Sequence, residues 1–312
     1  MMTGDLEALA NKLRASPGLS AKGDIAVATS RLDISCGSSV AVGDDCAAIP
    51  DGSGYTLFAI EGFMNQFVAD DPWFAGWCGV MVNVSDVAAM GGRPVAVVDA
   101  IWANGEREAH PVLAGLHAAA TAFGIPIVGG HTNLKTDRSQ LSVAILGKAK
   151  SLLTSFDAKP DDRLIAAIDL RGRYCELFSN WEAATTAPYA RLRADYELLP
   201  MIAEAGLSKS AKDISQGGIV GTAAMLADCS GVGAIIDIRA IPKPDDVSDE
   251  RWLFTFPSFG FLLSVSPEKV VDVIQRFRQR GIAASDIGAI TADRRVNITD
   301  GSMSETICDL SA

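Results

Sequence analysis

Apolar residues recur at strand-like spacing in several short stretches of the first half of this chain. The turn Asp51-Gly52-Ser53-Gly54 separates two of them, and the run from Pro94 to Ala103 is apolar enough for a buried strand. We expect strands at residues 39–49, 55–60, 94–103, 125–128 and 140–149, the first interrupted by Gly43-Asp44-Asp45.

Capping residues and helix breakers predict helices between these strands. Asp71 is suited to cap a helix and Pro72 to occupy its first turn, and Gly91-Gly92 is suited to end it. The N-terminal stretch is typical of a short amphipathic helix that stops at Pro17-Gly18, and not of a signal peptide. Helices are therefore expected from the N-terminal stretch up to Pro17-Gly18, and at residues 73–90 and 110–123.

The second half repeats a mixed order of strands and helices after a linker around residues 151–162, where Pro160-Asp161-Asp162 forms a turn. Because 312 residues exceed the usual size of a single core, we expect two domains, residues 1–150 and 151–312. The mixed order predicts an α+β fold. Strands are expected at residues 163–169, 211–214, 233–238, 259–265, 285–290 and 295–298, and helices at 195–205, 219–228 and 267–280.

Composition excludes several classes of function. The net charge of −11 disfavours nucleic-acid and anionic-lipid surfaces, which need clustered Lys and Arg, and no apolar run is long enough to cross a bilayer. The six cysteines include no Cys-x-x-Cys pair, so neither a zinc knuckle nor a disulfide framework is indicated. Reduced, buried thiols fit a cytoplasmic protein with no membrane or nucleic-acid partner.

Two groups of polar residues with oxygen-bearing side chains are candidates for chemistry. Asp44 and Asp45 are adjacent, and they form either a polar turn or a site for a hard cation such as Mg²⁺, which prefers oxygen ligands. Asn83 and Asp86 share one face of an otherwise apolar helix. That face is either a solvated stripe or a polar edge that meets a ligand.

Two glycine pairs are candidates for binding an anion. Gly129-Gly130 follows a predicted buried strand and precedes His131 and Thr132, so its amides permit close approach of a ligand, although a lone histidine is often structural. In the second half, Gly217-Gly218 opens a helix just after Asp213, where the helix dipole attracts phosphate. The chain lacks a Walker loop and a dinucleotide fingerprint, so a bound nucleotide has to be held by carboxylate-bound metal and backbone amides.

In this order and spacing, these stretches resemble the aminoimidazole ribonucleotide synthetase superfamily, which includes selenophosphate synthetase and thiamine-monophosphate kinase. The motifs are most similar to those of selenophosphate synthetase at Asp70-Asp71-Pro72, in the run from Ser85 to Pro94, and at Gly129 to Thr132. The sequence as a whole resembles an uncharacterised, synthetase-related subgroup of this superfamily. The resemblance spans nearly the whole chain.

The resemblance implies an N-terminal α+β domain whose strands form a barrel across a homodimer, followed by a ferredoxin-like α/β domain. ATP would lie between the halves. The implied ligands of Mg²⁺ or the phosphates are Asp44, Asp45, Asp86 and Asp213, and the implied nucleotide-lining residues are Asn83, Gly129, Gly130, Thr132, Gly217 and Gly218.

At three places the sequence differs from the family pattern, and these differences limit which metal ligands and which chemistry can be transferred to this chain. Ile60-Glu61 stands where relatives have Thr-Asp, so Glu61 keeps the charge of that metal ligand with one more methylene. The region before Asp44 offers only Lys22 and an isolated Cys36, which disfavours selenide chemistry. His131 and Gln216 replace two acids of thiamine-monophosphate kinase.

The sequence therefore predicts an ATP- and Mg²⁺-dependent phosphoryl-transfer enzyme, of kinase or synthetase type, for an unidentified small-molecule acceptor. Lys22, His131 and Lys212 are candidates for contacting the γ-phosphate. The alternatives are a non-catalytic nucleotide-binding protein, a selenophosphate synthetase-like water dikinase and a metal-dependent hydrolase. Residues 174–189 are expected to line the acceptor site, together with the nearby arginines.

Overall fold

The computed structural model describes residues 3–16, 31–32, 41–175 and 178–311. Contacts divide the chain into two compact units. We call Asp45–Leu152 with Ala184–Glu204 the N-terminal unit, and Met1–Asp44, Leu153–Ala183 and Ala205–Ala312 the C-terminal unit.

The N-terminal unit is built on a sheet in which the described residues form five strands. Neighbouring strands are antiparallel except β3 and β4, which run parallel. The order across the sheet is β1 (Ala47–Asp51), β2 (Gly54–Phe63), β5 (Lys135–Ala149), β3 (Arg93–Asn104) and β4 (Ile127–Asn133).

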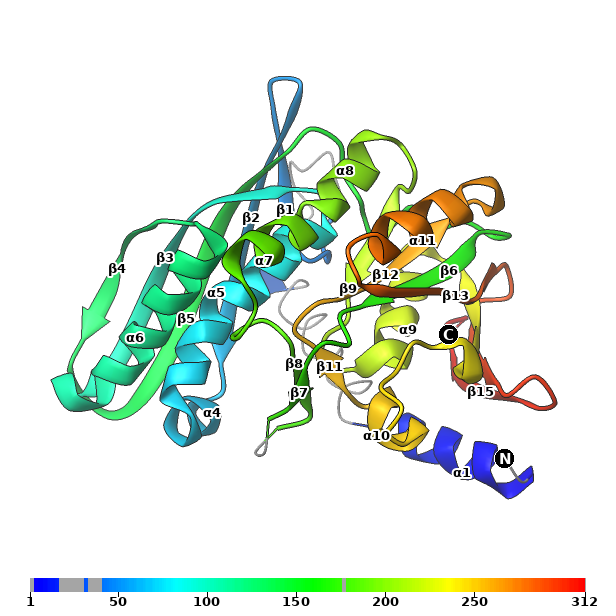
Figure 1. The fold of residues 1–312 in the computed structure, drawn as a ribbon, viewed down its shortest axis with the longest axis horizontal. Coiled ribbons are helices and arrows are strands. Elements are labelled where there is room, and N and C mark those ends of the chain that lie inside the picture. The colour runs from blue at the N-terminus through cyan, green and yellow to red at the C-terminus, as the bar shows by residue number, and fades with distance from the viewer. Residues whose placement is uncertain (1–2, 17–30, 33–40, 176–177, 312) are drawn as a thin grey trace. The chain divides into compact units, whose positions relative to one another are not determined.

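Helices α5 (Pro72–Ala89) and α6 (Glu106–Phe123) pack on one face of this sheet, after the short α4 (Asn65–Asp70) (Figure 1). Asp71 caps α5 by accepting a hydrogen bond from the Phe74 amide. Gly76 lets the two helices approach closely, because a Cβ there would lie 3.0 Å from the Leu116 nitrogen.

A segment from later in the chain completes the N-terminal unit. Helix α7 (Tyr189–Tyr196) contacts α6, and α8 (Leu198–Glu204) contacts α5. Arg193 donates hydrogen bonds to two carbonyl oxygens at the end of α6. Arg93 of β3 forms ion pairs with Glu197 and Glu204. These charged contacts fix the segment to the first helices and strands.

The C-terminal unit contains a mixed sheet of seven described strands, with α9 (Gly218–Ser230) on one face. Leu164, Ala166 and Ile168 of one central strand share a core with α9, and α11 (Val270–Arg278) also contacts that strand. The sheet order is β15 (Ser304–Asp309), β14 (Arg295–Thr299), β10 (Gly233–Asp237), β13 (Ala283–Thr291), β6 (Arg163–Ile168), β12 (Gly260–Val265) and β9 (Ser210–Asp213).

Smaller elements complete the C-terminal unit. Helix α1 (Thr3–Arg14) packs on β15, where Arg14 donates hydrogen bonds to Thr306 O. The remaining described elements are β7 (Arg173–Tyr174), β8 (Asn180–Glu182) and β11 (Phe256–Pro257), which form a small sheet, together with η1 (Ile238–Ala240), α10 (Asp249–Leu253) and η2 (Pro267–Lys269).

The mixed α+β class is confirmed, and most predicted elements are present. Three details were wrong. The described part of the first predicted strand is regular only from Ala47, the helix expected at residues 195–205 is two helices that begin at Tyr189, and Gly129–Thr132 lies inside a strand instead of a closing loop. The barrel, the ferredoxin-like layout and the division at residue 150 stay predictions. No described helix combines the length and apolarity needed to span a membrane.

Candidate functional site

Two carboxylates of the N-terminal unit, those of Asp45 and Glu61, lie in each other's electrostatic field. Glu61 is near the end of β2, and both residues are half-buried. Burial raises the pKa of Glu61, and the negative charge of Asp45 raises it further. Two neighbouring acids whose charges oppose each other in this way form a site that a cation would stabilise.

Asn83 and Asp86 on α5 are buried, so the interpretation of this helix face as a solvated stripe was wrong. Asn83 is 0% exposed and Asp86 is 6% exposed. The Asn83 amide nitrogen donates to Gly79 O at 2.8 Å and to Val143 O at 3.1 Å, which ties α5 to β5. The buried Asn83 Oδ1 accepts no hydrogen bond from the described residues. It is an oxygen donor that remains available.

The Gly129–Thr132 stretch lies on the exposed strand β4, which is at the sheet edge among the described strands, so the expectation of a buried strand before it was wrong. A Cβ on Gly129 would meet nothing within 4 Å. His131 is exposed, and its ring centroid lies 5.8 Å from that of Trp102 on β3. Thr132 is exposed as well. The stretch is therefore accessible to a ligand.

Asp99 on β3 is a candidate residue that the sequence analysis missed. It packs against Gly130, where an added Cβ would lie 2.5 Å from Asp99 Oδ1. Asp99 and Glu61 both lie opposite Val143, one on each side of β5, so they share the face covered by α5. Burial raises the pKa of Asp99. The available signal is an acid in the middle of the apolar run from Pro94 to Ala103, a pattern that by itself predicts only a buried strand.

Asp44 belongs to the C-terminal unit, and its carboxylate is bonded there. Its Oδ2 accepts a hydrogen bond from the Ser155 amide at 2.7 Å, and its Oδ1 accepts one from the Ser155 hydroxyl at 2.6 Å. The adjacent acids, which the sequence analysis treated as one pair, therefore have different surroundings.

The remaining described candidates lie around the start of α9 in the C-terminal unit. Lys212 is 7% exposed, and it points to the opposite face of β9 from the half-buried Asp213. Gly217 precedes α9 and is half-buried. Gly218 is buried with φ +64°, and a Cβ there would collide with the Leu253 carbonyl. Glycine at 218 thus meets an internal packing requirement.

Two aromatic residues of the 174–189 stretch, which was expected to line the acceptor site, differ in exposure. Trp181 is buried in the core of the C-terminal unit and donates a hydrogen bond to Asp169 O, whereas Tyr189 is exposed. Lys22 and Cys36 lie outside the described residues.

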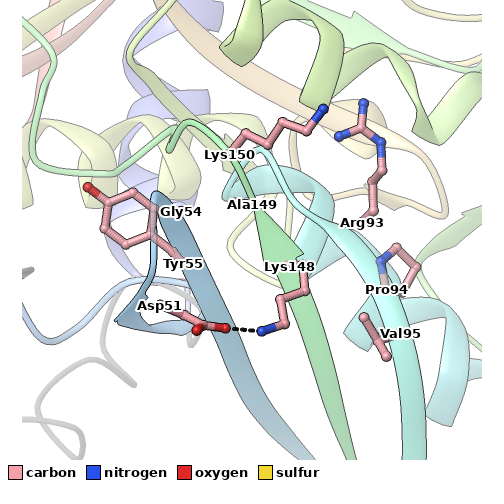
Figure 2. Close-up of a pocket in the computed structure, with 9 residues that line it drawn as sticks. All are labelled: Asp51, Gly54, Tyr55, Arg93, Pro94, Val95, Lys148, Ala149 and Lys150. Carbon is pink, nitrogen blue, oxygen red and sulfur yellow. Dashed lines mark hydrogen bonds and ion pairs between the residues drawn. The ribbon is translucent and has the colours of Figure 1, made fainter.

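Figure 2 shows a pocket of about 310 Å³ at one end of the N-terminal sheet. Lys148 forms an ion pair with Asp51, and Arg93 binds two glutamates, so acids balance these cations. None of the predicted site residues lines it. The lining residues are Asp51, Gly54, Tyr55, Arg93, Pro94, Val95, Lys148, Ala149 and Lys150.

Two family models match the chain. The AIR synthase related protein N-terminal domain matches residues 43–149, and the corresponding C-terminal domain matches residues 181–301. The chain belongs to the AIR synthase-related family. The N-terminal match contains Asp45, Glu61, Asp86 and the Gly129–Thr132 stretch, and the C-terminal match contains Asp213.

Several members of the AIR synthase-related family are similar over most of this chain. An uncharacterised Synechocystis protein is 46% identical, with 96% of this chain and 94% of the relative covered. An uncharacterised Methanocaldococcus jannaschii protein is 36% identical, with 76% and 74% covered. Thiamine-monophosphate kinase of Pyrococcus abyssi is 28% identical, with 74% and 79% covered.

Solved structures of other family members share the fold. PurL of Thermotoga maritima complexed with ATP has a TM-score of 0.74 at 19% identity, covering 85% of this chain and 46% of PurL. AaThiL complexed with AMPPCP and TMP has a TM-score of 0.69 at 20% identity, covering 89% and 93%. The chain thus spans nearly the whole of the ThiL protein and about half of PurL.

The donor set of the N-terminal unit fits a divalent cation that is shared with phosphate. No group of three or more His, Cys, Asp or Glu side chains in the described part of the chain is arranged to hold a metal ion. Mg²⁺ typically uses one or two protein carboxylates and takes its other ligands from water and substrate phosphates. The opposed charges of Asp45 and Glu61 and the available oxygen of Asn83 match that requirement.

Proposed function

We propose that this chain is an ATP-using phosphotransfer enzyme, of kinase or synthetase type, that acts with Mg²⁺ on a small-molecule acceptor. The observation that carries the proposal is the half-buried Asp45–Glu61 pair, in which one negative charge raises the pKa of the other acid. Membership of the AIR synthase-related family supports it, as do the kinase named among the relatives and the fold shared with PurL complexed with ATP.

In the N-terminal unit, Asp45, Glu61 and Asp86 are the proposed metal ligands. Bound Mg²⁺ would neutralise phosphate charge, which is the main requirement of phosphoryl transfer. The ionised carboxylates supply the counter-charge for the cation, and the burial of Asp86 limits competition from water. Protons compete with a cation for Glu61 up to a higher pH than for an ordinary glutamate, because its pKa is raised and the acid binds metal only in its charged form.

The exposed Gly129–Thr132 stretch is the proposed contact for phosphate oxygens. Among the described strands β4 is at the sheet edge, so only one of its sides is paired, with β3. Backbone amides on its other side, the Thr132 hydroxyl and the His131 ring are suited to donate hydrogen bonds to an anion. Lys212, Asp213 and Gly217 stay predictions for the C-terminal unit.

The direct test incubates the purified chain with ATP, Mg²⁺ and fractionated metabolite pools and measures ADP and AMP. We expect nucleotide release that depends on an acceptor. Nucleotide binding without any turnover would instead indicate a non-catalytic binding protein. Phosphate release that needs no acceptor would indicate a hydrolase.

We also propose that the face of the N-terminal sheet on which no described helix packs forms a homodimer interface. Phe58 and Leu146 are cross-strand neighbours, and Ile60 and Val98 flank Ala144 in the next row. The four larger residues of this apolar face, Phe58, Ile60, Val98 and Leu146, are 36–66% exposed, on the side opposite α5 and α6. A second copy offers the matching apolar patch, as a two-fold interface requires.

Light scattering after gel filtration tests the dimer. Phe58→Lys places a charge on the sheet face and is expected to give folded monomers. Leu113→Lys is the matched control, because Leu113 is a 42% exposed leucine on α6, away from that face, and this variant should remain dimeric. A monomeric wild type, or equal effects of the two variants, would contradict the proposal.

A further inference from the structure

The pocket in Figure 2 is separate from the carboxylates of the proposed phosphotransfer site, and all of its lining residues belong to the N-terminal unit. Glu61 and Asp99 both pair with Val143 of β5, whereas Arg93 pairs with Lys148, five residues further along that strand. Five residues of a strand span about 17 Å. Reacting groups have to come within about 3.5 Å of each other, so a small ligand of this pocket is not the phosphoryl acceptor.

A close approach of two strands and a β-bulge shape the backbone around the pocket. A Cβ on Gly54 would lie 2.5 Å from the Ala149 carbonyl oxygen, so glycine lets β2 and β5 approach each other here. The register of β3 shifts just after Pro94, where Val95 has no partner on β5. Bulges redirect side chains, and Val95 is 43% exposed. Val95, Pro94 and Tyr55 therefore give the pocket an apolar surface.

Two cations stand directly opposite each other across the strands at this pocket. Arg93 of β3 pairs with Lys148 of β5, and like charges in such a pair destabilise a sheet. The two side chains turn to different acids, Lys148 to Asp51, and Arg93 to Glu197 and Glu204. Figure 2 shows Lys148 extending toward Asp51 and away from Arg93. An acid bound in the pocket would offset the repulsion that remains between the two cations.

Lys150, directly after β5, adds a third cation with unused donors. Its side chain is 80% exposed, and its ammonium lies 4.0 Å from Glu204 Oε1, which is too long for a hydrogen bond. The same oxygen accepts a hydrogen bond from Arg93 Nη1, so the two cations converge on one acid (Figure 2). Arg93 uses one N–H group on each of its three nitrogens for Glu197 and Glu204. A guanidinium carries five, so both cations keep N–H groups that no described residue accepts.

We propose that this pocket binds a small molecule that carries a carboxylate or a phosphate on an apolar body. Arg93 and Lys150 donate hydrogen bonds to the oxyanion. The apolar body packs on Tyr55, Pro94 and Val95. The volume of about 310 Å³ is at the lower end of the range for small-molecule pockets, about 300–1,000 Å³. This second site goes beyond the proposed function and does not depend on phosphotransfer activity.

Calorimetric titration with benzoate and with phenyl phosphate, without nucleotide, tests the pocket. We expect saturable binding of one molecule per chain, and the tighter probe identifies the acidic group as carboxylate or phosphate. Benzamide has the shape of benzoate without its charge and should bind at least about 10-fold more weakly than benzoate. Inorganic phosphate lacks the apolar body and should bind more weakly than phenyl phosphate. Benzamide binding as tight as that of benzoate, or no saturable binding of either acid, would overturn the proposal.

Reversing one charge locates the bound anion. Lys150→Glu should weaken binding of the tighter probe at least about 10-fold, because it places a negative charge beside the oxyanion. Lys135→Glu is the matched control, because Lys135 is an exposed lysine at the other end of β5 and does not line the pocket. It makes the same change in net charge and should bind as wild type does. Equal effects of the two variants would show that binding follows net charge alone and would overturn the site.

A third variant predicts tighter binding, which a loss of folding cannot imitate. Glu204→Gln keeps an acceptor for Arg93 Nη1 and removes the negative charge that competes with the ligand for Arg93 and Lys150. We expect about 5-fold tighter binding of the probe at low salt, and a smaller gain at high salt. Light scattering checks that the variants keep the wild-type assembly. Unchanged or weaker binding by Glu204→Gln with a wild-type circular dichroism spectrum would overturn the assignment of Arg93 and Lys150 as the oxyanion contacts.

Discussion

Replacing Gly130 by alanine perturbs the contact between β4 and Asp99 directly. The added Cβ would lie 2.5 Å from both the Asp99 carbonyl oxygen and Asp99 Oδ1. Rotation of the Asp99 side chain relieves only one of these contacts, so the strands must separate. Overpacking of this kind costs about 1–3 kcal/mol, and the reduced entropy of the unfolded chain returns about 0.4–1 kcal/mol. We therefore expect a net loss of about 1–2 kcal/mol.

Gly129→Ala is the matched control, because a Cβ at the neighbouring position meets nothing within 4 Å. It should leave the free energy of unfolding unchanged or raise it by up to about 0.5 kcal/mol. Urea denaturation of both variants measures the difference. Nucleotide titration then shows whether displacement of Asp99 also weakens binding. Equal stability of the two variants would refute the assigned contact between Gly130 and Asp99.

Two further predictions concern charged groups of the N-terminal unit. Arg93→Met removes ion pairs with Glu197 and Glu204 and should cost about 1 kcal/mol, less at high salt; a salt-independent loss in urea denaturation would contradict it. The raised pKa of Glu61 keeps its proton bound to a higher pH in the native state than in the unfolded chain. The free energy of unfolding should therefore fall as the pH rises from the ordinary glutamate range to that raised pKa. Glu61→Gln, measured by thermal unfolding without metal, should remove this dependence of the free energy of unfolding on pH. The same pH dependence in the variant and the wild type would contradict the prediction.

Local chemistry made parts of the fold predictable from sequence. Asp71-Pro72 and Gly91-Gly92 identified the limits of α5 to within two residues, because capping and helix termination depend on neighbouring residues. Gly129-Gly130 was identified as a junction for its flexibility, but tertiary pairing with β3 makes it part of a strand. Such pairing depends on residues about 30 positions away along the chain.

The sequence allowed candidate residues of the site to be named, but not how they are arranged in space. Asp45 and Asp86 were identified from acids in unusual surroundings. Asp99 was missed, because its importance depends on register, which places it and Glu61 on opposite sides of Val143. The surroundings of Asp44 also depend on a partner far along the chain, Ser155, which donates two hydrogen bonds to it. No local pattern contains that information.

Calorimetric titration with a non-hydrolysable ATP analogue, with and without Mg²⁺, tests the central claim most directly when wild type is compared with Asp86→Asn. The substitution preserves the shape of a side chain that is 6% exposed and removes its charge. We expect metal-dependent binding by wild type, and none by Asp86→Asn, with the same circular dichroism spectrum for both. Equal nucleotide affinity of the two proteins in the presence of Mg²⁺ would contradict the account.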